Sequence, residues 1–160
     1  MKSLKTLSLE LHDLLYGTGR TLSTAESCTG GGIAAAIVAT SGSSDYFKGG
    51  VVSYCNEIKE RLLGVNPDTI EKYNVVSAEV ATEMCQGAMR SLQTDYAIAI
   101  TGAAGPTGGT EEIPVGTIWI AYGSKDDIRT YKLTENQGRE KNLRNATKKA
   151  LELIVDLIKL

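Results

Sequence analysis

The sequence contains a single histidine, His12, among its 160 residues. A Ser-His-Asp or Cys-His site needs a histidine beside its nucleophile, and His12 lies next to the apolar stripe of a predicted N-terminal helix, where a surface or edge position is expected. The cysteines Cys28, Cys55 and Cys85 are odd in number and widely spaced. They indicate neither a disulfide framework nor a zinc site.

Basic blocks and long apolar runs are also scarce. The formal net charge is −2, and no Lys/Arg-rich block precedes the C-terminal helix, so nucleic-acid binding has little electrostatic support. No apolar run approaches the roughly 20 residues of a membrane span. The N-terminus has the pattern of an amphipathic helix rather than a signal peptide, which predicts a cytoplasmic protein. A Gly-Lys-Ser/Thr phosphate loop is absent, and no Gly-x-Gly-x-x-Gly follows the first predicted strand.

The length and a composition of 42% hydrophobic and 22% charged residues predict one domain over residues 1–160. Periodicity and turn residues delimit its elements. Helices and strands alternate, which predicts a layered α/β domain with a largely parallel sheet, made mixed by a hairpin near the end. Predicted strands cover 21–25, 49–54, 96–100, 117–122 and 128–133. Predicted helices cover 4–15, 33 to about 40, a segment capped by Asn56 that ends at 63, 67–73, a segment capped by Ser77 that ends at 92, and 140–159.

The stretch 24–32 reads Thr-Ala-Glu-Ser-Cys-Thr-Gly-Gly-Gly and joins the first predicted strand to a helix. Three successive glycines let the backbone approach a ligand closely, and free N–H groups at a helix start favour an anion or a developing oxyanion. Ser27 or Cys28 beside such donors is the arrangement that acyl transfer needs. A glycine-rich turn that only packs the helix against the strand is the alternative.

Polar residues also follow the second and third predicted strands, at the edge where open α/β sheets bind ligands. Tyr54 closes the second strand, and Thr101 opens a glycine-rich loop over 101–109. Because no histidine is available, Lys59 with Tyr54 is the best base for Ser27. A lysine serves as a base only if burial or a cationic neighbour lowers its pKa, and otherwise it binds phosphate.

Three alternatives remain open on the residues alone. Cys28 is a rival nucleophile, although a small buried cysteine is the commoner role. A buried strand tyrosine is the alternative for Tyr54. Glu26 has a secondary role, because consecutive strand side chains point to opposite faces.

Several segments resemble the CinA C-terminal-domain family, whose members include stand-alone nicotinamide-mononucleotide amidohydrolases. Ala-Glu-Ser-Cys-Thr-Gly-Gly at 25–31 is one of them. The matching segments run in order over nearly the whole chain and are highly specific as a set. They are 25–31, 42–44, 46–47, 52–59, 63–65, 76–77, 101–106, 108–109 and 114–117.

The resemblance implies a three-layer α/β/α sandwich and hydrolysis of the carboxamide of nicotinamide mononucleotide to nicotinate mononucleotide and ammonia, in pyridine-nucleotide recycling. It implies no metal or organic cofactor, and a homodimer or a larger homo-oligomer. The family's catalytic serine, tyrosine and lysine fall on Ser27, Tyr54 and Lys59. Longer members also carry a molybdopterin-binding-like N-terminal domain, for which this chain has no room.

The resulting hypothesis is that Ser27 attacks the carboxamide carbon, activated by Lys59 and Tyr54, while backbone donors near 29–31 stabilise the oxyanion. Backbone N–H groups of 30–32 or 105–109, with one of two arginines, hold the substrate phosphate. The expected substrate-binding residues are Thr29, Gly30, Gly31, Thr101, Gly102, Gly105, Gly108, Arg139 and Arg144.

The sequence departs from the family pattern at Cys55, where serine is common, at Ile113, where lysine is common, and at Gln137. The departures at Cys55 and Ile113 keep a rival function open, a non-catalytic nucleotide-binding module. The departure at Gln137, with the displaced Arg144, leaves open which arginine reaches the phosphate. A third possible function is an amidase for a different phosphorylated amide. A mechanism in which Ser27 only positions water is a further alternative.

Overall fold

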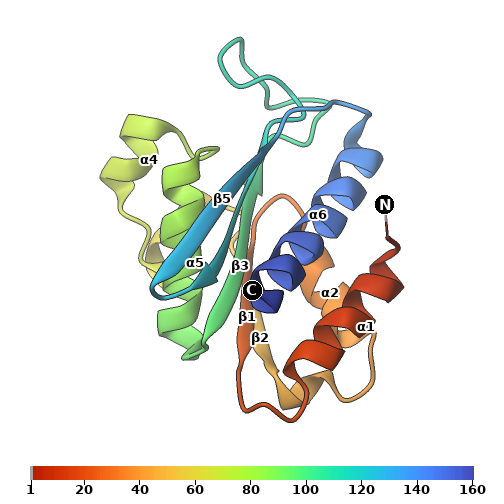
Figure 1. The fold of residues 1–160 in the computed structure, drawn as a ribbon. Helices are drawn as coiled ribbons and strands as arrows, with labels where there is room; N and C mark the ends of the chain where they lie inside the picture. Colours follow the sequence, from red (N-terminus) through yellow and green to blue (C-terminus); the bar gives the residue numbers. More distant parts are fainter. Residues whose placement is uncertain (1) are drawn as a thin grey trace.

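The computed structural model describes residues 2–160, which fold around one five-stranded sheet (Figure 1). Its strands are β1 (Leu22–Glu26), β2 (Phe47–Val52), β3 (Tyr96–Gly102), β4 (Ile118–Ser124) and β5 (Asp127–Leu133), in the order β2-β1-β3-β4-β5. β1 pairs in parallel with β2 and β3, whereas β4 is antiparallel to both of its neighbours. The predicted mixed, mostly parallel sheet is therefore confirmed.

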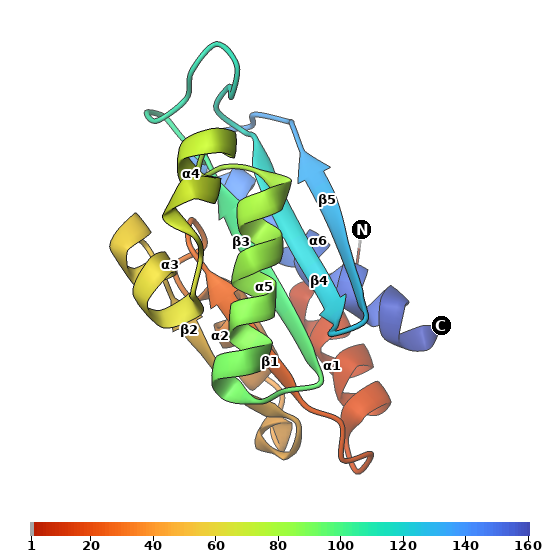
Figure 2. The same cartoon turned by 90° about the vertical axis from the view of Figure 1, so that its left-hand side faces the viewer.

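Helices cover both faces of the sheet, which confirms the three-layer α/β/α sandwich (Figure 1 and Figure 2). One face carries α1 (Leu4–Leu15), α2 (Gly32–Val38) and α6 (Arg139–Lys159). The other carries α3 (Asn56–Leu63) and α5 (Ala78–Leu92), with α4 (Pro67–Tyr73) packed against α5. A short 3-10 turn, Ser43–Asp45, precedes β2.

The central strand β3 shows why both faces need cover. Ile98 and Ile100 are fully buried in the cluster that includes α1 and α6, whereas Ala97 and Ala99 are buried in the cluster that includes α5. Because successive strand side chains point to opposite faces, the apolar run of β3 has no solvent side. Each buried isoleucine stabilises the fold by about 1.5–3 kcal/mol.

Local signals define several helix ends as predicted. Ser77 caps α5 by accepting a hydrogen bond from the Val80 N–H, and Gly64 ends α3 with a φ of 67°. Pro67 occupies the first turn of α4 behind an Asn66 cap.

Two predictions on the segment after β2 are wrong. β2 ends at Val52 rather than at residue 54, so Tyr54 lies in a loop with 62% of its surface exposed and is not a buried strand tyrosine. The pairing with β1 sets this end, because β1 also ends opposite Val52. Cys55, not Asn56, is the N-cap of α3, and its side chain makes no capping hydrogen bond.

Within residues 2–160, no helix has both the length and the apolar character needed to cross a bilayer.

Candidate functional site

Ser27 directly follows β1 at the carboxyl edge of the sheet. Its N–H donates to the Ile100 carbonyl on β3, at 3.1 Å, and its own carbonyl accepts from the Gly30 N–H at 3.0 Å. The first bond extends the pairing with β3 by one residue, and the second curls the chain into a tight turn. The Ser27 side chain therefore projects from the end of the strand, and only 8% of the residue is exposed.

Lys59 reaches Ser27 from α3. Its Nζ lies 3.0 Å from Ser27 Oγ and donates to the Ser53 carbonyl at 2.8 Å. The residue is 1% exposed, and no acidic side chain of residues 2–160 forms a salt bridge with it. Burial lowers the pKa of Lys59, and the nearby Cys55 and Cys28 thiols oppose this shift only in part. The structure thus gives Ser27 a neighbouring amine that loses its proton more readily than a free lysine.

Glu26 is the buried anion beside this turn. Its carboxylate accepts from Thr29 Oγ1 at 2.6 Å and from the N–H groups of Ile33 and Ala34 at 2.8 and 3.0 Å. The start of α2 is therefore already occupied by a carboxylate of the chain itself. Glu26 and Ser27 do point to opposite faces, and Glu26 fastens the turn to α2.

The predicted binding residues of this first turn lie outside the cleft that Ser27 and Lys59 face. The Gly30 and Gly32 N–H groups donate to the Ser27 and Thr29 carbonyls, both at 3.0 Å. Thr29, Gly30 and Gly31 are not among the residues that line the cleft described next, so the structure does not bring them to it.

A cleft of about 330 Å³ opens at the carboxyl ends of β1 and β3. This volume is at the lower end of the range for small-molecule sites, roughly 300–1,000 Å³. The structure brings most of the predicted site residues to its wall. They are Ser27, Tyr54, Lys59, Thr101, Gly102, Gly105, Gly108 and Arg139.

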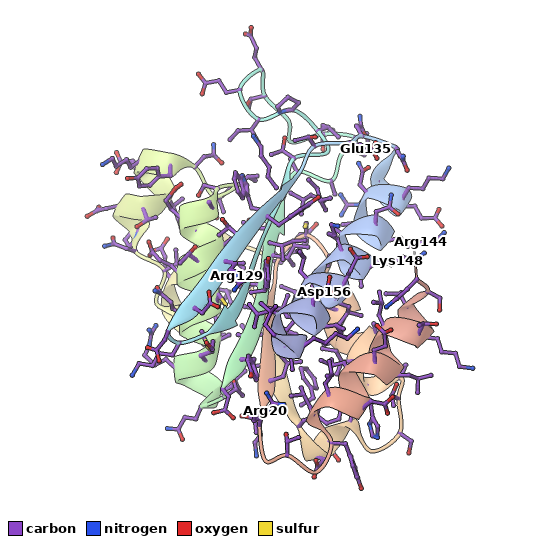
Figure 3. The ribbon with its side chains drawn as sticks, in the orientation of Figure 1. Arg20, Arg129, Glu135, Arg144, Lys148 and Asp156 are labelled. Atoms are coloured by element: carbon purple, nitrogen blue, oxygen red, sulfur yellow. The ribbon has the colours of Figure 1, made fainter. Side chains whose placement is uncertain are left out.

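Arg139 and Tyr54 meet at the rim of this cleft. Arg139 Nη1 donates to the Gly105 carbonyl at 2.8 Å, and Nη2 donates to the Tyr54 hydroxyl at 3.2 Å. Tyr54 therefore contacts the arginine, and the structure shows no hydrogen bond between Tyr54 and Lys59 within residues 2–160. Arg144 instead pairs with Glu140 at 3.2 Å and does not line the cleft. Figure 3 shows Arg144 on the outer side of α6.

Thr101 contributes to the wall rather than offering a free hydroxyl. Its Oγ1 donates to the Val75 carbonyl at 3.0 Å, and the residue is 1% exposed. This bond fixes the segment that carries Val75 and Val76, two wall residues that the sequence analysis missed. It also missed the wall residue Asn56 as a possible ligand contact, because its position was interpreted as a helix cap.

Cys28 also lines the cleft, but it is a poor nucleophile. Burial raises the pKa of its thiol to about 12, so the thiol stays protonated at neutral pH. His12 lies elsewhere, with Nδ1 3.2 Å from the Tyr46 hydroxyl and its ring stacked on Tyr16. Over residues 2–160, no three or more His, Cys, Asp or Glu side chains gather in a group that could hold a metal ion.

The chain matches a known protein family over nearly its whole length. The family model described as CinA C-terminal domain matches residues 4–158. The chain belongs to this family. As a CinA-family chain it shares 49% identity over 124 residues with a CinA-like protein of Shewanella piezotolerans, over 78% of this chain and 29% of the relative. It shares 45% identity over 150 residues with a CinA-like protein of Flavobacterium psychrophilum, over 94% of this chain and 36% of the relative. The chain thus spans about a third of the length of these curated relatives.

Solved structures of the family share the whole fold. The competence/damage inducible protein CihA from Agrobacterium tumefaciens superposes with a TM-score of 0.94 at 33% identity, over 98% of this chain and 96% of that one. The competence damage-inducible protein A from Klebsiella pneumoniae gives a TM-score of 0.93 at 32% identity, over 97% and 96% of the two chains. These names refer to competence and damage, and none of them states a reaction.

Proposed function

We propose that this chain hydrolyses the carboxamide of nicotinamide mononucleotide to nicotinate mononucleotide and ammonia, with Ser27 as the nucleophile and Lys59 as its base. One observation carries the proposal. Lys59 Nζ lies 3.0 Å from Ser27 Oγ, both residues are buried, and both face the same cleft. A buried amine beside a serine hydroxyl replaces the histidine that serine hydrolases usually use.

In the first step neutral Lys59 accepts the Ser27 hydroxyl proton while Oγ forms a bond to the carboxamide carbon. The other hydrogen bond of Nζ, to the Ser53 carbonyl, keeps the amine in place during this transfer. Because burial disfavours the charged amine, Lys59 then returns the proton readily to the leaving nitrogen. The carbon–nitrogen bond breaks and ammonia departs, leaving an ester on Ser27.

A backbone donor of the same turn suits the oxyanion that forms in this step. The N–H group of Cys28, a residue that lines the cleft, donates to no oxygen of residues 2–160. It follows the nucleophile directly, as oxyanion donors do in many acyl-transfer enzymes. Water then attacks the ester while Lys59 takes one of its protons. Lys59 returns that proton to Ser27 Oγ as the carbon–oxygen bond breaks, and nicotinate mononucleotide leaves.

Arg139 is the cation that suits the substrate phosphate. A guanidinium has five N–H donors, and two of those on Arg139 are used by Gly105 and Tyr54. These two bonds hold its plane at the rim and leave the other donors for an anion. Tyr54 therefore orients Arg139 in this proposal instead of activating Ser27, and Arg144 has no part in binding.

The test is to incubate the purified protein with nicotinamide mononucleotide and to measure ammonia and nicotinate mononucleotide. We expect turnover in the wild type, none in Ser27→Ala, and unchanged turnover in Ser44→Ala, which alters an exposed serine. Rapid quenching is expected to trap an acyl adduct on Ser27.

Other outcomes separate the rival functions. A wild type that binds the nucleotide without turnover would establish a nucleotide-binding module instead. Turnover of other phosphorylated amides but not of this one would change the substrate. Turnover that survives Ser27→Ala would overturn the mechanism, and the water-positioning alternative predicts activity without any adduct.

A further inference from the structure

Asn142 is a buried polar residue that lies behind the wall of the cleft. It sits in the first turns of α6, and 4% of it is exposed. It lines a separate hollow with Gly116 and Ile118 and does not line the cleft itself. All of its amide is engaged, so its side chain has one fixed orientation.

Three hydrogen bonds fix that orientation. Asn142 Nδ2 donates to the Ala104 carbonyl at 3.0 Å and to Asn136 Oδ1 at 3.1 Å, and Oδ1 accepts from the Gln137 N–H at 2.8 Å. The amide therefore joins the loop before α6 to the loop after β3. A buried side chain that satisfies three partners at once strongly resists rotation.

The contact with Ala104 decides which way the next N–H points. The peptide between Ala104 and Gly105 is trans, and in a trans peptide the carbonyl and the N–H lie in one plane and point in opposite directions. The Ala104 carbonyl points to Asn142, a residue that does not line the cleft. The Gly105 N–H consequently points toward the cleft, and it donates to no acceptor of residues 2–160.

Arg139 holds the following carbonyl in the same way. Its Nη1 donates to the Gly105 carbonyl at 2.8 Å, so two successive carbonyls of this loop are bound by the first turns of α6. A free backbone N–H and a guanidinium at adjoining positions of a wall form a site that suits a phosphate-type anion.

We infer that Asn142 is a positioning residue for anion binding, which acts by holding the Gly105 N–H toward the cleft beside Arg139. The inference rests on the proposed function for the identity of the substrate. Anion binding at Gly105 itself does not depend on turnover. Because Asn142 touches neither Ser27 nor Lys59, its effect is on the binding of the anionic group and not on the chemical step.

Asn142→Asp is the matched change. Aspartate keeps the oxygen that accepts from the Gln137 N–H but replaces the donor with an acceptor that faces the Ala104 carbonyl. Repulsion between these two oxygens favours rotation of the Ala104–Gly105 peptide. We expect the KM for nicotinamide mononucleotide to rise about tenfold, the loss of one hydrogen bond to a charged group, with kcat nearly unchanged. Asn145→Asp is the control, since Asn145 Nδ2 donates to Gln137 Oε1 at 3.2 Å and does not touch Ala104.

A second measurement uses the wild type and inorganic phosphate. In ¹⁵N–¹H spectra, the Gly105 amide is expected to shift on phosphate addition, while that of Gly17, which lies in the distant turn after α1, stays in place. This tests anion binding at Gly105, on which the inference depends, even if Asn142→Asp does not fold or the wild type does not hydrolyse the nucleotide. A Gly105 amide that phosphate does not move would overturn it. A folded Asn142→Asp variant with the wild-type KM, or one that lost kcat instead, would also overturn it.

Discussion

Two glycine-rich turns follow neighbouring strands of one sheet, yet they use their backbone donors in different ways. In the turn after β1, the donors of Gly30, Gly32, Ile33 and Ala34 are bound by carbonyls and by the Glu26 carboxylate. In the loop after β3, two carbonyls are bound by side chains of α6, and the Gly105 N–H stays free at the cleft. Glycine content thus does not decide whether a loop binds a ligand; the partners of its peptide groups do.

The largest effect is expected at Lys59. A change there tests the chemistry at the turn after β1 and leaves anion binding at the loop after β3 intact. Lys59→Met is expected to lower kcat by at least about a thousandfold, because the nucleophile loses its base. Lys48→Met, at an exposed position of β2, is the control and should keep the wild-type rate. A Lys59→Met variant that retained more than a tenth of the rate would show that Ser27 is activated in another way.

The same prediction has a pH dependence. Burial lowers the pKa of Lys59, and the base works in its neutral form, so kcat/KM should rise with pH through that lowered pKa and level off above it. Between the lowered value and the ordinary value of 10.5, the unfolded chain binds more protons than the folded one. The stability of the wild type relative to Lys59→Met therefore rises with pH in that window. Rate profiles and denaturant unfolding at several pH values measure the two effects.

The next effect in size concerns Glu26 and tests whether the first turn is held internally. Glu26→Gln replaces one acceptor oxygen with a donor that faces other donors, and should cost about 1–3 kcal/mol of unfolding free energy. Because the turn carries Ser27, kcat should fall while KM changes little. Glu140→Gln, at an exposed position of α6, is the control. A variant with lower stability but an unchanged kcat would show that Glu26 supports only α2.

The smallest effect distinguishes the two arginines and tests the second loop. Arg139→Lys should raise KM about tenfold, since lysine cannot bind Gly105, Tyr54 and an anion in one plane. Arg144→Lys removes an exposed pair with Glu140, which contributes about 0–1 kcal/mol, and KM should stay as in the wild type. Steady-state kinetics of the two variants make the comparison, and an equal rise in both would contradict it.

Much of the fold follows from local patterns in the chain. The alternation of apolar residues predicts the strands and helices, and the turn residues Gly64, Pro67 and Ser77 fix ends that the structure confirms. The predicted end of β2 at residue 54 is wrong, because this edge strand extends only as far as its pairing with β1. That pairing joins Phe47–Val52 to Leu22–Glu26, and no local signal marks where it stops.

The candidate site was predictable in part. Rim position and residue type suggested Ser27 and Lys59, and the structure places them 3.0 Å apart. The contact of Tyr54 with Arg139 joins residues 85 apart in the chain. The neighbouring sequence therefore could not show that Tyr54 contacts Arg139 instead of Lys59. Asn142 gave no signal, because a single asparagine in a helix has the pattern of an ordinary polar residue.

The sequence by itself determined the elements and the edge of the sheet at which the polar turns meet, because periodicity and turn chemistry depend on residues close together in the chain. It also determined which side chains are available for chemistry. Only the tertiary structure decided that Lys59 is buried against Ser27, that Glu26 fills the helix start, and that Gly105 is left with a free N–H. Each of these depends on hydrogen-bond partners and burial contributed by distant segments, and no local pattern specifies them.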